Sequence, residues 1–202
     1  MEKRIITVSR EFGSGGRSVG KALAKRLGWK YYDKELVKAV AEKTGFDPRF
    51  IEERGEFSVG KSLLSYALAG QGMPGVMNGM SASDFLWCMQ REVILKLAEE
   101  GGCVIVGRCA DYILREFDHC LRVFVHADRN WRLLHMRKLM PDTPFEQLEA
   151  DMDSADRARR SYCKQHTGQI YGDSRNYDLT LCTSKLGLDK AEEILLCAAK
   201  NL

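Results

Sequence analysis

The segment that decides the fold reads I-I-T-V-S-R-E-F-G-S-G-G-R-S and runs from Ile5 to Ser18. It begins with the apolar composition of a buried strand, continues into a stretch rich in glycine, and is followed by the helical pattern of residues 19–27. Glycines let the backbone turn with positive φ and point several N–H groups at one anion. The helix that follows adds the positive end of its dipole. The segment therefore predicts a strand, a phosphate-binding loop and a helix.

The loop departs at two positions from the G-x-x-x-x-G-K-[ST] pattern of phosphate-binding loops. Aligned on that pattern, the chain has Glu11 in place of the first glycine and Arg17 in place of the lysine. The helix dipole disfavours a cation in the first turn, so a bound anion explains Arg17 better than a solvated arginine does. Ser18 is either an ordinary helix-start serine or the hydroxyl ligand of a phosphate-bound Mg²⁺. The predicted phosphate-binding residues are Gly13, Ser14, Gly15, Gly16, Arg17 and Ser18.

Length and composition indicate a single globular domain. The 202 residues are 45% hydrophobic and 29% charged, and the net charge of +3 is too small to predict a nucleic-acid partner. We expect a cytoplasmic protein without a membrane partner, because there is neither an apolar signal region nor a stretch approaching the roughly 18 apolar residues of a span. Seven cysteines without a C-x-x-C pair argue against a disulfide framework and a zinc site.

Apolar runs alternate with helical patterns along the rest of the chain, which is typical of a parallel sheet built from strand–helix–strand units. Helices are expected over residues 33–43, from Ser83 toward Gly101, from a Thr143–Glu146 capping box with proline at the first helical position, and from Asp189. The segment Gly70–Gly79 is either a flap over a substrate or a connector. Strands are expected at Arg4–Ser9, Trp29–Tyr32, Cys103–Gly107, Leu121–Ala127 and Asp178–Thr183.

Two arginine-bearing segments indicate further phosphate contacts. Arg108 follows the strand that ends at Gly107, and ligands of open α/β sheets bind at the carboxyl ends of the strands. The second segment is Asp156-Arg157-Ala158-Arg159-Arg160, within a predicted helix. Its three arginines form either a solvated face or a lid that closes over a transferring phosphoryl group.

Five motifs follow one another along the chain. They are S-R-E-F-G-S-G-G-R-S at 9–18, Y-Y-D-K-E-L at 31–36, V-I-V-G-R-C-A-D-Y-I-L at 104–114, D-R-A-R-R-S-Y at 156–162, and T-G with Y-G-D-S-R-N-Y-D-L at 167–179. Taken together, these motifs resemble the cytidylate kinase-like family. The resemblance implies the α/β fold of P-loop kinases, three layers with a five-stranded parallel sheet in the order 2-3-1-4-5. It also implies a core at 1–45, 82–140 and 176–202, a nucleoside monophosphate-binding insert at about 46–81, and an arginine-rich lid at about 141–175.

The resemblance implies ATP- and Mg²⁺-dependent phosphoryl transfer to a pyrimidine nucleoside monophosphate, with CMP and dCMP as the first candidates. Asp33, one of the implied substrate-binding residues, is explained equally well as a helix cap. The implied catalytic residues are Arg17, Arg108, Arg157, Arg159 and Arg160. The implied substrate-binding residues are Asp33, Arg108, Asp111, Asp156 and Arg159, and Ser18 is implied as the metal ligand.

Two departures from the bacterial cytidylate kinases leave alternatives open. Their loop reads G-P-S-G-A-G-K-G, and their G-R-D motif has an aspartate that helps to read cytosine where this chain has Cys109. Asp111 is the alternative carboxylate. The remaining readings are a kinase of the same fold with another small-molecule acceptor, a nucleotide-binding module without catalysis, and an anion-binding protein with no nucleotide role.

Overall fold

The computed structural model describes residues 4–48, 51 and 79–202. Its centre is a five-stranded parallel sheet in the order β2-β3-β1-β4-β5, which confirms the expected topology. Each of the predicted strands is present within one residue at either end. Because all neighbours are parallel, every strand ends at the same edge of the sheet. The strands are β1 (Ile5–Arg10), β2 (Lys30–Tyr32), β3 (Cys103–Val106), β4 (Cys120–His126) and β5 (Leu179–Cys182).

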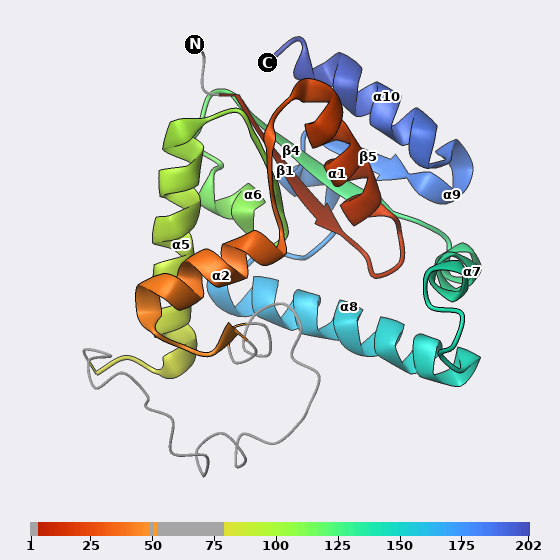
Figure 1. Ribbon diagram of the computed structural model, residues 1–202, viewed down its shortest axis with the longest axis horizontal. Helices are drawn as coiled ribbons and strands as arrows, with labels where there is room; N and C mark the ends of the chain where they lie inside the picture. Colours follow the sequence, from red (N-terminus) through yellow and green to blue (C-terminus); the bar gives the residue numbers. More distant parts are fainter. Residues whose placement is uncertain (1–3, 49–50, 52–78) are drawn as a thin grey trace.

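Helices cover both faces of the sheet (Figure 1). On one face α1 (Gly16–Leu27) packs beside α10 (Leu188–Ala199), and the other face is covered by α2 (Lys34–Thr44), α5 (Ala82–Glu100) and α6 (Ala110–Ile113). Two further helices pack together at the carboxyl edge of the strands, where α8 runs across the molecule past the end of β1. They are α7 (Arg129–Leu139) and α8 (Phe145–Thr167); the short η1 (Ser174–Asn176) and α9 (Thr183–Leu186) flank β5.

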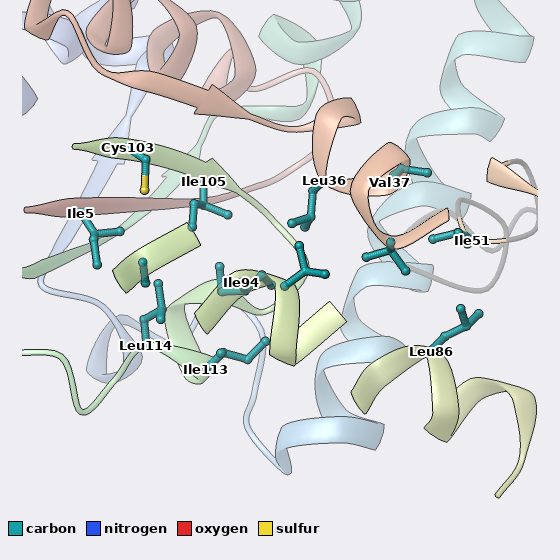
Figure 2. Close-up of a cluster of buried hydrophobic side chains, with 14 of the residues drawn as sticks. Ile5, Leu36, Val37, Ile51, Leu86, Ile94, Cys103, Ile105, Ile113 and Leu114 are labelled. Carbon is teal, nitrogen blue, oxygen red and sulfur yellow. The ribbon is translucent and has the colours of Figure 1, made fainter. Parts of the chain in front are cut away.

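The side chains of the strands alternate between two apolar cores. Ile5 and Ile105 lie in the core with α2, α5 and α6, which Figure 2 shows in detail. Ile6 and Val8 lie in the core with α1 and α10. A sheet buried on both faces needs apolar residues at successive positions, which explains the uninterrupted apolar runs in the sequence.

The structure moves three predicted helix starts by one residue, to Ala82, Phe145 and Leu188, and it places Asp33 at an N-cap position as expected. The Thr143–Glu146 capping box does not form: Pro144 is the N-cap residue, with an extended ψ of 145° and no side-chain cap hydrogen bond, so the helix begins at Phe145. Asp33 stands at the N-cap of α2, but its side chain makes no capping hydrogen bond. The last helix begins at Leu188, which places Asp189 inside the first turn.

Several sequence predictions fall partly outside the described residues. Residues 70–78 of the predicted flap and all of the predicted insert at 46–81 except 46–48, 51 and 79–81 lie there. The predicted lid region at 141–175 contains α8, which is one continuous helix. Within the described part of the chain, no helix is both long and apolar enough to cross a membrane.

An ion pair between Arg122 of β4 and Asp178, directly before β5, joins the last two strands of the sheet. The Asp178 carboxylate accepts hydrogen bonds from the Arg122 backbone N–H at 2.8 Å and from its guanidinium Nη2 at 2.6 Å. Partial burial raises the pKa of Asp178, but the hydrogen bonds from Arg122 outweigh it, and the resulting pKa lies below the ordinary value. A lowered pKa in the folded state stabilises the protein above the unfolded-state pKa, and this stability is lost as the pH falls through the folded-state value.

We expect Asp178→Asn to lower the free energy of unfolding at pH 7 by about 1 kcal/mol, because the pair is partly exposed. The difference from the wild type should shrink as the pH falls below about 4, where the wild-type carboxylate also takes up a proton. Urea unfolding at pH 7, 5 and 3.5 measures it, with the exposed turn residue Asp142→Asn as the control. A pH-independent difference would contradict this account.

Candidate phosphate-binding site

The chain turns from β1 into α1 through a loop that only glycine fits. Gly13 and Gly15 have φ of +73° and +83°, a conformation that costs other residues free energy. A Cβ atom on Gly15 would lie 2.3 Å from Leu188 Cδ2, and one on Gly16 would lie 2.7 Å from Arg10 Cβ. The glycines of the predicted loop are therefore required by close packing as well as by backbone conformation.

The loop leads into a helix start that suits an anion. The N–H groups of Gly16, Arg17 and Ser18 belong to the first turn of α1, which has no carbonyl groups of its own to receive them, and the positive end of the dipole lies there. A pocket of about 150 Å³ opens at this point. Its lining includes Gly13, Gly15, Gly16, Arg17, Ser18 and Arg159.

Ser14 faces the interior of the protein. Its side chain is fully buried, with Oγ 2.9 Å from the Glu11 carbonyl oxygen and 3.0 Å from that of Val125. The Thr183 hydroxyl donates to the Ser14 carbonyl at 2.7 Å. Ser14 thus anchors the loop to β4 and to the first residue of α9. Thr183 lies far along the chain and gave no sequence signal for this role.

Arg17 is held at the mouth of the loop by Asp33. The guanidinium makes a two-point contact, with Nε 2.9 Å from Oδ2 and Nη2 3.1 Å from Oδ1. A second pocket, of about 280 Å³, lies here and shares Arg17 and Ser18 with the first. Asp33 and Tyr31 also line it, and burial, reinforced by the Asp33 charge, raises the pKa of Tyr31 to about 12. The predicted site residues Arg17, Ser18 and Asp33 therefore lie together.

Arg108 stands in a strained turn after β3. Gly107, Arg108 and Cys109 follow one another with φ of +75°, +58° and +52°, and the two non-glycine residues each cost of order 1–3 kcal/mol in this region. The Arg108 side chain is 4% exposed and donates to the Ile51 carbonyl at 3.2 Å. Strain retained beside a buried arginine at the carboxyl edge of the sheet is typical of a functional site.

The two candidates for the base-reading carboxylate both lie in the interior. Cys109 packs with Tyr162 and Cys163 in a small buried cluster. Asp111 is 5% exposed and accepts a hydrogen bond from Ser9 Oγ at 2.9 Å. The structure thus gives Asp111 a contact that ties α6 to β1.

The three arginines of the charged cluster on α8 lie in different places, and one of them lies at the loop. Arg159 is 3% exposed and donates from Nη1 to the Arg10 carbonyl at 3.2 Å. Arg157 is exposed, whereas Arg160 lines a different pocket of about 260 Å³ that contains His126 and Tyr171. Of the three predicted arginines, Arg159 is the one that lines the loop pocket.

Asp156 is 5% exposed and bonds to the loop. Its Oδ1 accepts from the Phe12 N–H at 2.7 Å, and its Oδ2 accepts from Arg132 Nη1 at 2.5 Å. Arg132 Nη1 also lies 3.1 Å from the Phe12 carbonyl oxygen. In this structure the predicted substrate-binding pair Asp156 and Arg159 therefore contacts the backbone of residues 10–12.

The contacts of Glu11 explain why a glutamate can replace the first glycine of the phosphate-loop pattern. Its Oε2 accepts from the Ala127 N–H at 3.2 Å and lies 3.6 Å from Arg132 Nε. The carboxylate is thus bound to the β4–α7 connection and to α7. Sequence reasoning missed Arg132, whose position in an ordinary amphipathic stretch carries no signal.

Tyr171, in the segment that follows α8, binds the backbone at the end of β1. Its hydroxyl donates to the Arg10 carbonyl at 2.8 Å and accepts from the Arg10 N–H at 3.1 Å. Its ring meets Phe124 of β4 edge-on, with centroids 5.3 Å apart. The segment after α8 therefore also fastens the start of the loop.

The sheet order, the glycine loop and the loop's position at the carboxyl edge define the P-loop kinase fold. The chain belongs to the cytidylate kinase-like family, whose family model matches residues 5–185. A comparison with curated proteins finds no match.

Solved structures show the same fold. An uncharacterized protein from Eubacterium ventriosum ATCC 27560 is 23% identical with a TM-score of 0.73, covering 98% of this chain and 99% of that one. Shikimate kinase from Bacteroides thetaiotaomicron is 14% identical with a TM-score of 0.55, covering 98% of each chain. Shikimate kinase from Acinetobacter baumannii, in complex with shikimate, is 16% identical with a TM-score of 0.52, covering 98% of this chain and 94% of that one.

We expect Gly15→Ala to cost about 2 kcal/mol of unfolding free energy, because it adds an unfavourable φ and the end of the Leu188 side chain must move to make room. Gly28→Ala is the matched control: its φ is +68° and a Cβ there meets nothing within 4 Å, so about 1 kcal/mol is expected. Chemical unfolding of both variants measures the difference. Equal losses would show that the clash is relieved at no cost.

Proposed function

We propose that this protein transfers a phosphoryl group from Mg·ATP to a pyrimidine nucleoside monophosphate, with CMP and dCMP as the first acceptors. The observation that carries the proposal is the loop pocket, where glycine backbone, Arg17, Ser18 and the buried Arg159 surround one small hollow at the carboxyl edge of the sheet. Membership of the cytidylate kinase-like family supports the same reaction class.

The residues present fit a nucleotide's phosphate chain and its metal. The positive φ of Gly13 and Gly15 lets the loop turn into α1, and the first-turn N–H groups of α1 would hold the donor β-phosphate. The Ser18 hydroxyl would hold Mg²⁺. When bound, the metal would neutralise charge on the β- and γ-phosphates.

The protein's own side chains would mainly align the donor and acceptor and neutralise the charge of the moving phosphoryl group. Phosphoryl transfer has a loose transition state, so catalysis depends on positioning and on positive charge around the moving group. Arg17 would bind the β/γ edge of the donor with the two-point geometry it now uses toward Asp33. Arg108 and Arg159 would meet the acceptor side, and Arg157 and Arg160 are assigned to the transferring group by the family resemblance alone.

A second candidate is a kinase of the same fold with another acceptor. It is favoured by the positions of Cys109, packed in an aromatic cluster, and of Asp111, bonded to Ser9. The acceptor panel in the test therefore includes non-nucleotide alcohols.

The test is ADP release from Mg·ATP with CMP, dCMP, UMP, AMP, GMP, shikimate or no acceptor. We expect turnover with CMP or dCMP, and we expect Arg17→Ala to lower kcat/KM by about a hundredfold or more, because it removes a cation from the donor phosphates. Lys25→Ala is the matched control, since Lys25 is an exposed cation on the same helix, far from its first turn. ATP binding without turnover for any acceptor would favour a non-catalytic module, and full activity of Arg17→Ala would refute the donor assignment.

A further inference from the structure

The backbone N–H and C=O of Phe12 are both bound by one buried ion pair. Asp156 of α8 accepts its N–H and Arg132 of α7 donates to its carbonyl, while the two side chains bond to each other at 2.5 Å. Both side chains are less than 10% exposed. Phe12 directly precedes Gly13, where the loop first turns with positive φ. The pair therefore fixes the peptide from which the loop departs.

The same pair reaches the two residues on the other side of Phe12. Arg132 Nε lies 3.6 Å from Glu11, and Asp156 lies 3.5 Å from Arg159, which in turn donates to the Arg10 carbonyl. Three successive loop residues are thus connected to two charged side chains from separate helices. Removing one partner of a buried pair of this kind is destabilising, because the other charge is left buried without compensation.

From this geometry we infer that Arg132 and Asp156 are positioning residues for the donor side of the site. Both Asp156 oxygens are already engaged, one by a loop N–H and one by a guanidinium. The pair acts through the loop backbone on the affinity for the donor phosphate chain, and it affects the affinity for the acceptor less, through the contact of Asp156 with Arg159. The inference rests on the proposed function for its kinetic consequence, and on the geometry of the loop for its binding consequence.

The test measures binding of Mg·ADP and of inorganic tripolyphosphate by titration calorimetry. Tripolyphosphate isolates the phosphate contacts from those of the base and sugar. Asp156→Asn and Arg132→Gln should each weaken both ligands by about tenfold or more, because a hydrogen bond to a charged group is lost at the loop. The double variant should be no more than about threefold worse than either single variant, because the two residues act as one unit.

Arg129→Gln is the matched control. Arg129 also joins α7 to α8, through Asp153 and Glu149, but on the exposed surface. Its loss should change binding by less than about twofold. If Arg132→Gln does not fold, Arg132→Lys keeps the charge and one donor, and it should show a smaller loss in the same direction.

Kinetics distinguish this inference from an acceptor-binding role. With an active wild type, both variants should raise the KM for ATP by a larger factor than the KM for the acceptor. Folded variants with wild-type affinity for tripolyphosphate, or with only the acceptor KM raised, would overturn the inference, as would a wild type that binds neither ligand. A wild type that binds both ligands but turns over no acceptor would defeat the kinase proposal, while the binding comparison still decides the role of the pair.

Discussion

The architecture depends on one tight passage of the backbone, where β1 ends and α1 begins six residues later. Within that distance the chain must reverse its direction, avoid Leu188 and Arg10, and leave the first N–H groups of α1 facing a pocket. Two residues with left-handed backbone make the turn possible. The loop does not hold this shape by its own hydrogen bonds alone: Thr183 fixes the carbonyl of Ser14 from beyond β5, and Asp156 fixes the N–H of Phe12 from α8.

The unusual composition of the loop follows from those supports. A glutamate at the first position of a phosphate-binding loop brings negative charge near the site, which is unfavourable unless the charge is neutralised. Here that carboxylate accepts a hydrogen bond from the Ala127 N–H and forms an ion pair with the Arg132 guanidinium. Arg17 is similarly matched by Asp33. The two departures from the common pattern are therefore each accompanied by a partner of opposite polarity from another part of the fold.

Local pattern was sufficient to predict the strands and the loop, because a sheet buried on both faces leaves continuous apolar runs and a left-handed turn requires glycine. The strand order came from the family resemblance, since periodicity carries no information about which strands are neighbours. Pro144 was misplaced by one residue because a fixed φ does not determine ψ. Arg132 was missed because its partners are distant in the sequence: Asp156 lies 24 residues toward the C-terminus and Glu11 more than 100 residues toward the N-terminus. Such contacts exist only after α7 and α8 have packed.

The binding of Glu11 to α7 also bears on how freely this loop can be exchanged. Here, a transplanted loop with glycine at position 11 would leave the Ala127 N–H and the guanidinium of Arg132 without the carboxylate that now receives them. Residues 11 and 132 are thus coupled in this fold, and a chimera that moves the loop must carry the helix residue with it.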